Sequence, residues 1–149
     1  PAGSARRRSC RVSRPTSRLR QNVNGIKFMR DPTRGGLAAT LNEISKSTGL
    51  SIEINQPAIP VTPTVQAAAD ILGLDVLNTA NEGKFVAVVS PQSADKCLRI
   101  CKKNTLGKKA SIIGTVIKTH DTPAVEMITR IGGKRIVPMP YGRELPRIC

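Results

Sequence analysis

Apolar positions along the chain follow two different periods, and the alternation between them predicts alternating strands and helices. Short apolar or alternating runs predict strands at residues 26–29, 50–54, 84–89 and 111–117. Apolar residues spaced three or four apart predict helices at residues 34–48, 63–72 and 91–102. Two further runs, 125–131 and 135–137, flank Gly132-Gly133 as a hairpin. We therefore expect one α/β domain with a mixed sheet and about three helices.

Proline and glycine mark the ends of these helices. Thr62 and Ser90 each precede a proline, an arrangement typical of an N-cap followed by the first helical position. Gly49 and Gly73 stand where the first and second helices end. The buried face of the second helix is expected to consist of Val65, Ala68, Ala69 and Leu72.

Composition predicts a globular chain with an aliphatic core, because 39% of its residues are hydrophobic but only 2% are aromatic. No run is long and apolar enough to span a membrane. The net charge is +14, and seven arginines lie in the first twenty residues, before the first acid, Asp31. Residues 1–25 are therefore predicted to be a disordered basic leader.

Two cysteines, Cys97 and Cys101, lie four residues apart on the third predicted helix and face the same way. No metal site is predicted for them, because the chain has a single histidine, His120. We expect two buried thiols among apolar side chains, and a reducing, cytoplasmic compartment. Cys10, in the leader, is given no role.

The chain ends in Cys149, after a tail that prolines at positions 138, 140 and 146 keep extended. A terminus is a poor place for a buried structural thiol, but it leaves the sulfur accessible as a nucleophile. Residues 138–149 can carry that sulfur over about 35 Å, at about 3.3 Å per extended residue. The tail indicates a thiol that carries or accepts a chemical group, and the alternative is a disordered end that happens to finish in cysteine.

Two polar segments stand next to apolar runs. Residues 33–36 open the first predicted helix, where backbone N–H groups freed by Gly35 and Gly36, with Arg34 alongside, suit an anion such as phosphate. Glu82 and Lys84 place a carboxylate and an ammonium before the strand at 84–89. The alternative for residues 81–83 is a simple turn with solvated charges.

Three motifs together resemble the HypE family, the hydrogenase maturation proteins that make the cyanide ligands of nickel-iron hydrogenases. They are Met29-Arg30-Asp31-Pro32-Thr33-Arg34-Gly35-Gly36-Leu37, Ala80-Asn81-Glu82-Gly83-Lys84 and Pro146-Arg147-Ile148-Cys149. The resemblance runs from about residue 26 to residue 149. It implies the C-terminal half of that family, which lies within the aminoimidazole ribonucleotide synthetase superfamily, with an α/β domain at 26–137 and a flexible tail at 138–149.

The resemblance also implies a reaction. In the family, a carbamoyltransferase partner, HypF, carbamoylates the terminal thiol, which corresponds to Cys149, and the enzyme dehydrates the product to a thiocyanate with ATP and Mg²⁺. The cyano group passes to a scaffold complex, HypC-HypD, and the complete family member is a homodimer. No membrane partner and no specific nucleic-acid partner is expected.

Roles for individual residues follow from the same resemblance. Glu82 is the candidate base, and Arg34, Gly35 and Gly36 are the elements expected to face the phosphates of ATP. Asp31 is expected to orient Arg34 or to assist metal binding, and Lys84 to neutralise charge. The alternative for Asp31 and Arg34 is a structural ion pair that fixes the loop.

The leader has three possible interpretations: a nucleic-acid-binding arm, a targeting segment, or non-native sequence attached to a truncated domain. It has no aromatic side chain to stack on bases, and it lacks the apolar core of a secretory signal. We favour the third, because nothing in the leader stands in for the family's N-terminal domain, which supplies much of the ATP site. Two functions remain open: the C-terminal part of a carbamoyl dehydratase, or an inactive folding and binding module.

Overall fold

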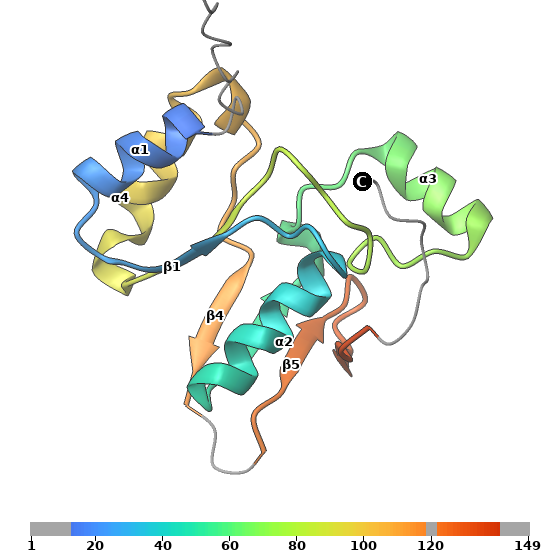
Figure 1. The fold of residues 1–149 in the computed structure, drawn as a ribbon. Coiled ribbons are helices and arrows are strands. Elements are labelled where there is room, and N and C mark those ends of the chain that lie inside the picture. Colours follow the sequence, from blue (N-terminus) through green and yellow to red (C-terminus); the bar gives the residue numbers. More distant parts are fainter. Residues whose placement is uncertain (1–12, 119–121, 141–149) are drawn as a thin grey trace, which may run out of the picture.

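Strands of this chain form two sheets in the computed structural model, which describes residues 13–118 and 122–140 (Figure 1). In the smaller sheet, β1 (Ile26–Arg30) pairs antiparallel with β3 (Val86–Val89). The larger sheet has the order β4-β2-β5-β6 and is built from β2 (Ser51–Asn55), β4 (Gly114–Ile117), β5 (Val125–Ile128) and β6 (Lys134–Ile136). Because β2 and β5 are parallel while the other pairs are antiparallel, the predicted mixed sheet is confirmed.

Four α-helices accompany the sheets in the described residues: α1 (Ser13–Asn22), α2 (Gly36–Thr48), α3 (Pro63–Leu72) and α4 (Pro91–Lys102). Short 3-10 turns, η1 (Gln56–Ala58) and η2 (Thr105–Gly107), follow β2 and α4. Pro63 and Pro91 occupy the first helical positions, and Gly49 and Gly73 end their helices in the left-handed conformation, as the sequence predicts. These local signals therefore place the helices correctly.

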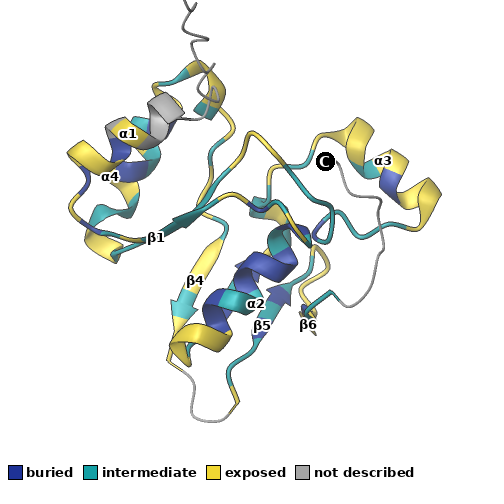
Figure 2. Cartoon of the chain, viewed as in Figure 1, coloured by how far each residue is buried: buried dark blue, intermediate teal, exposed yellow. Residues whose placement is uncertain are grey.

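The apolar interior is divided into two clusters (Figure 2). In the larger, α2 covers the four-stranded sheet, and its members are Ala38, Leu41, Ile44, Ile52, Ile54, Leu77, Val125, Met127 and Val137. In the smaller, α1 and α4 pack together through Leu19, Val23, Cys97 and Cys101. The chain thus has a main core under α2 and a second core between α1 and α4.

The helix α1 corrects one prediction, because it lies inside the segment expected to be a disordered leader. Leu19 is fully buried, and Val23, the residue after α1, is 3% exposed. Their spacing of four residues puts both on the side that meets α4. Two buried apolar side chains suffice to fix this stretch despite its arginines. Residues 1–12, including Cys10, lie outside the described part.

The helix α3 corrects a second prediction. Of its expected inner face, only Ala69 is buried, whereas Val65 is 54% exposed, Leu72 is 68% exposed and Ala68 is also exposed. The helix therefore contacts the rest of the described structure through a narrow strip. Spacing identified an apolar face correctly but did not identify what covers it.

The thiols of Cys97 and Cys101 are buried and free, which confirms their assignment to the apolar interior. Burial, with a smaller contribution from the neighbouring Cys97, raises the pKa of Cys101 to about 11. Both thiols are therefore neutral at physiological pH. No helix in the described ranges has the length and apolar character needed to cross a lipid bilayer.

Candidate functional site

Two of the three motif segments meet at the beginning of α2. The backbone N–H of Asn81 donates to the carbonyl oxygen of Pro32 at 2.9 Å, and the N–H of Ala38 donates to that of Leu77 at 2.9 Å. The first hydrogen bond joins the loop after β1 to the loop before β3, and the second joins the first turn of α2 to that same loop. The fold therefore brings together the segments that the sequence singled out separately.

Gly36 permits this close approach. Its φ is +62°, and a Cβ added there would lie 2.4 Å from the carbonyl oxygen of Leu77 and 2.6 Å from that of Thr79. Real Cβ atoms do not come so close to backbone oxygens, so any other residue would push the two loops apart. The role of Gly36 is thus packing between backbones, rather than only exposing N–H groups to an anion.

Gly35 links the same site to the root of the tail, the described residues 137–140. It is the N-cap of α2 with φ 68°, and its carbonyl accepts from the N–H of Ala39 at 3.0 Å. A Cβ added at Gly35 would lie 3.0 Å from Cγ of Pro140. The tail therefore leaves the domain beside the N-terminus of α2, and residues 141–149, with Cys149, lie outside the described part.

Asn42 holds this root in place and was missed by the sequence analysis. Its side-chain Nδ2 donates to the carbonyl oxygen of Ala38 at 2.9 Å and to that of Val137 at 3.0 Å. Val137 is 2% exposed, and its own N–H donates to the carbonyl of Val125. An asparagine on a polar position of a helix gives no sequence signal for a hydrogen bond to a residue 95 positions away.

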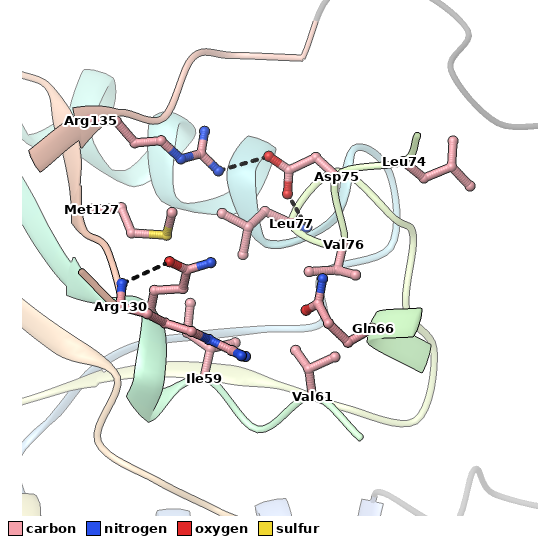
Figure 3. Close-up of a pocket in the computed structure, with 11 residues that line it drawn as sticks. Ile59, Val61, Gln66, Leu74, Asp75, Val76, Leu77, Met127, Arg130 and Arg135 are labelled. Atoms are coloured by element: carbon pink, nitrogen blue, oxygen red, sulfur yellow. Dashed lines mark hydrogen bonds and ion pairs between the residues drawn. The ribbon is translucent and has the colours of Figure 1, made fainter. Parts of the chain in front are cut away.

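Asp75 shapes the loop on which Leu77 lies (Figure 3). Its Oδ1 accepts from the N–H of Leu77 at 2.9 Å, and its Oδ2 pairs with Nη2 of Arg135 at 2.9 Å. A pocket of about 180 Å³ opens on this side of the loop, lined also by Ile59, Val61, Gln66 and Arg130. None of the residues predicted to carry the chemistry lines it, so we place the candidate site at the α2 N-terminus instead.

The predicted charged residues all lie at the surface of this junction. Asp31, Arg34, Glu82 and Lys84 are each exposed. Among the described residues Asp31 and Arg34 form no ion pair with each other, so the structural alternative for them finds no support. Because Glu82 is exposed, the described part of the chain does not shield its carboxylate from water.

Two neighbouring contacts hold the segments that lead into the two joined loops. Arg30, the last residue of β1, pairs with Glu43 on α2. In the orientation of its amide that satisfies both ends, Asn81 accepts from Nζ of Lys84 at 3.0 Å and donates to the carbonyl of Glu82 at 3.2 Å. Lys84 therefore helps to shape its own loop while its ammonium group stays at the surface.

The N-terminus of α2 fits a phosphate in part. It has the partial positive charge of a thirteen-residue helix, with Arg34 exposed beside it. The N–H of Ala38 is already bonded, however, and the carbonyl oxygens around Gly36 oppose an anion at that point. In the described ranges no three His, Cys, Asp or Glu side chains are grouped to hold a metal ion. The chain therefore offers one wall of an anion site.

Comparison with known proteins shows the family to which the sequence of this chain is similar. A family model described as AIR synthase related protein, C-terminal domain, matches residues 11–125. The carbamoyl dehydratase HypE of Rhizobium leguminosarum bv. viciae is 52% identical over 124 residues, which cover 83% of this chain and 35% of that protein. The chain thus spans about a third of the length of the curated relatives it matches. The family match begins at residue 11 and therefore includes α1.

Solved structures give the same result. A hydrogenase maturation protein HypE superposes with a TM-score of 0.88 at 36% identity, covering 93% of this chain and 44% of that one. A HypE structure in complex with ATP has a TM-score of 0.85 at 36% identity, covering 91% and 42%. A HypE-HypF complex has a TM-score of 0.81 at 41% identity, covering 87% and 41%.

Proposed function

This chain belongs to the family of AIR synthase related proteins, as their C-terminal domain, and from that premise we propose that it is the C-terminal part of an ATP-dependent carbamoyl dehydratase. In this proposal Cys149 carries a carbamoyl group that the complete enzyme converts to a thiocyanate, the source of cyanide ligands for nickel-iron hydrogenases. The curated relatives named carbamoyl dehydratase HypE support the assignment.

One observation carries the proposal: the tail starts at the same place where the two motif loops meet. Pro140 lies against Gly35 at the N-terminus of α2, with Arg34 exposed alongside. The nine residues from Tyr141 to Cys149 span at most about 30 Å at about 3.3 Å each, so the thiol reaches both this site and a partner protein. A tethered substrate needs both destinations within reach.

The proposed chemistry has two steps. In the first, the sulfur of Cys149 attacks the carbonyl carbon of a carbamoyl donor held by the carbamoyltransferase HypF. The bond from that carbon to the donor's leaving group breaks, the leaving group departs with the electron pair, the thiol proton is lost, and an S-carboxamide results. In the second, the amide oxygen attacks the γ-phosphorus of ATP and ADP leaves. Loss of both N–H protons then expels the oxygen as phosphate and closes the carbon-nitrogen triple bond. The phosphate is needed because oxide itself is a poor leaving group.

Glu82 is proposed to accept a proton from the nitrogen, and Arg34, Gly35, Gly36 and Lys84 to face the phosphates. Because Glu82 is exposed here, its role requires a second wall that excludes water, supplied by the N-terminal domain of the complete enzyme. The solved relative in complex with ATP supports ATP as the phosphoryl donor. A Mg²⁺ ion would use Asp31 together with phosphate oxygens and water, the ligands it prefers.

The partners are part of the same proposal. The solved HypE-HypF complex of a relative supports HypF as the carbamoyl donor. We further propose HypC-HypD as the acceptor of the cyano group, a homodimer as the complete assembly, and the cytoplasm as the compartment. The free thiols of Cys97 and Cys101 accord with reducing conditions.

The acceptor role is tested by intact-mass spectrometry of the chain with HypF, carbamoyl phosphate and ATP. We expect a gain of about 43 Da, one carbamoyl group, mapped by peptide digestion to Cys149. Cys97 and Cys101 serve as internal controls, because their buried, neutral thiols are expected to stay unmodified. A Cys149→Ser variant that still gains this mass would overturn the proposal. The alternative function, an inactive folding and binding module, would then remain.

The roles of Glu82 and Arg34 are tested in the second step. The measurement is the conversion of the carbamoyl group to a thiocyanate after an N-terminal domain is supplied. Glu82→Gln is expected to accept the carbamoyl group at the normal rate but to stop there. Arg34→Ala is expected to raise the ATP concentration needed for half-maximal conversion. If Glu82→Gln converts as fast as the parent chain, the base lies elsewhere, and the acceptor role of Cys149 is unaffected.

A further inference from the structure

Positive charge is concentrated in two segments of the sequence. Residues 1–25 and 85–113 together contain thirteen of the 24 Lys and Arg residues and one acid, Asp95. The remaining sequence has eleven cations against nine acids. Nearly all of the net charge therefore belongs to the segments that form and flank α1 and α4, which pack on each other (Figure 1).

The cations of residues 85–113 lie on α4 and in the residues on either side of η2. These six cations are Lys96, Arg99, Lys102, Lys103, Lys108 and Lys109, all exposed and none in an ion pair with a described residue. We call these six residues, together with Leu106, the α4–η2 surface. Six unpaired like charges repel one another, so the arrangement lowers stability unless an anionic partner offsets it.

Leu106 lies between Lys103 and Lys108 in the sequence and is 60% exposed. Its position is fixed by its backbone, because its N–H donates to Oδ1 of Asn104 at 2.9 Å. Gly107 then packs against the end of α4, where an added Cβ would come within 2.2 Å of the carbonyl oxygen of Cys101. A rigid turn thus presents a large apolar side chain to solvent, with lysines on both sides of it in sequence.

We propose that the α4–η2 surface docks an acidic protein segment that inserts one apolar side chain beside Leu106. Carboxylates of the partner would meet the exposed lysines, while the contact with Leu106 excludes water around the apolar side chain. The preformed turn reduces the entropy lost on binding. This site is separate from the α2 N-terminus. Its occupant is a segment of another protein, neither ATP nor the tail of this chain.

A protein partner explains this surface better than a nucleic acid does. Five of the six cations are lysines, which lack the planar fork that arginine uses on phosphates and guanine. The described surface has no aromatic side chain on which a base could stack. A phosphate backbone would also make no apolar contact with Leu106, whereas an apolar contact flanked by polar and charged residues is typical of protein interfaces.

The test uses the full chain and two labelled peptides, measured by fluorescence anisotropy at low and high salt. Both peptides carry glutamates on either side of a central residue, which is leucine in one and serine in the other. We expect the leucine peptide to bind about tenfold more tightly, the effect of burying one apolar side chain. Salt is expected to weaken both, because it screens exposed charges.

Matched variants locate the contact. Leu106→Ser is expected to abolish the difference between the two peptides, whereas Leu72→Ser keeps it, because Leu72 is similarly exposed but lies on α3. Replacing Lys108 and Lys109 with serine is expected to weaken both peptides and reduce their salt dependence, while Lys46→Ser on α2 does not.

Three results would overturn the proposal: no binding of either peptide, equal affinity for the two peptides, or a Leu106→Ser variant that still distinguishes them. A DNA duplex that displaces the leucine peptide at lower concentration than the unlabelled peptide itself would identify a nucleic-acid surface instead. None of these results bears on carbamoylation of Cys149, so failure here is separable from failure of the dehydratase assignment.

Discussion

Replacing Gly36 with alanine perturbs the junction on which the candidate site depends. The left-handed backbone costs a non-glycine residue about 1–2 kcal/mol. The new methyl group would also lie 2.4 Å and 2.6 Å from the carbonyl oxygens of Leu77 and Thr79, so those backbones must move. That movement breaks the hydrogen bond from the N–H of Ala38 to Leu77, and leaving such buried groups unpaired costs about 1–3 kcal/mol. We expect Gly36→Ala to lower the free energy of unfolding by about 2–5 kcal/mol.

Gly49→Ala is the matched control for this prediction. Gly49 has φ +69° but nothing within 4 Å of an added Cβ, so it keeps the backbone cost and lacks the clash. We expect it to lose only about 1–2 kcal/mol. Urea unfolding of both variants measures the difference, which is the contribution of the close approach. Equal losses in the two variants, with unchanged urea dependence, would refute the account of how the loops are joined.

Three further predictions concern residues around the two cores. The pKa of Cys101 rises on folding from 9.0 to about 11, so the folded state disfavours the thiolate and stability is lost as pH rises from 9 to 11. The unfolding free energy should fall over that range by about 2 kcal/mol more in the parent chain than in Cys101→Ala, and equal pH profiles would contradict this. Asn42→Ala loses the bond to Val137, so we expect about 1 kcal/mol less stability and faster proteolysis of the tail root, and unchanged proteolysis would contradict it. Asp75→Ala leaves the N–H of Leu77 and the guanidinium of Arg135 without their carboxylate, and urea unfolding should show a loss of about 1–2 kcal/mol, which an unchanged midpoint would contradict.

Local signals in the sequence predicted most elements because each signal acts over a few residues. Pro63, Pro91, Gly49 and Gly73 restrict their own backbones, so the ends of the helices could be read directly. The helix α1 was missed because arginines dominate its composition, although the Leu19 and Val23 pair carried the helical spacing. Pairing those two apolar residues with the two thiols of α4, which show the same spacing of four, would have predicted the second core.

The candidate site was predictable in its residues but not in its geometry. The sequence identified both glycines, yet the closeness of Gly36 to Leu77 depends on a tertiary contact between distant loops. The sites of Asn42 and Asp75 depend on hydrogen bonds to Val137 and Leu77, which no periodicity encodes. For α3, the spacing showed an apolar face but not whether anything in this chain covers it.

The dehydration step tests the central claim most directly. The chain is first carbamoylated on Cys149, then incubated with ATP and Mg²⁺, with and without a separately produced N-terminal domain, and followed by intact mass. We predict that the gain of about 43 Da falls to about 25 Da, the mass of a cyano group replacing hydrogen, only when that domain is present. A carbamoyl group that persists on Cys149 under both conditions, while a complete dehydratase converts its own tail, would contradict the claim.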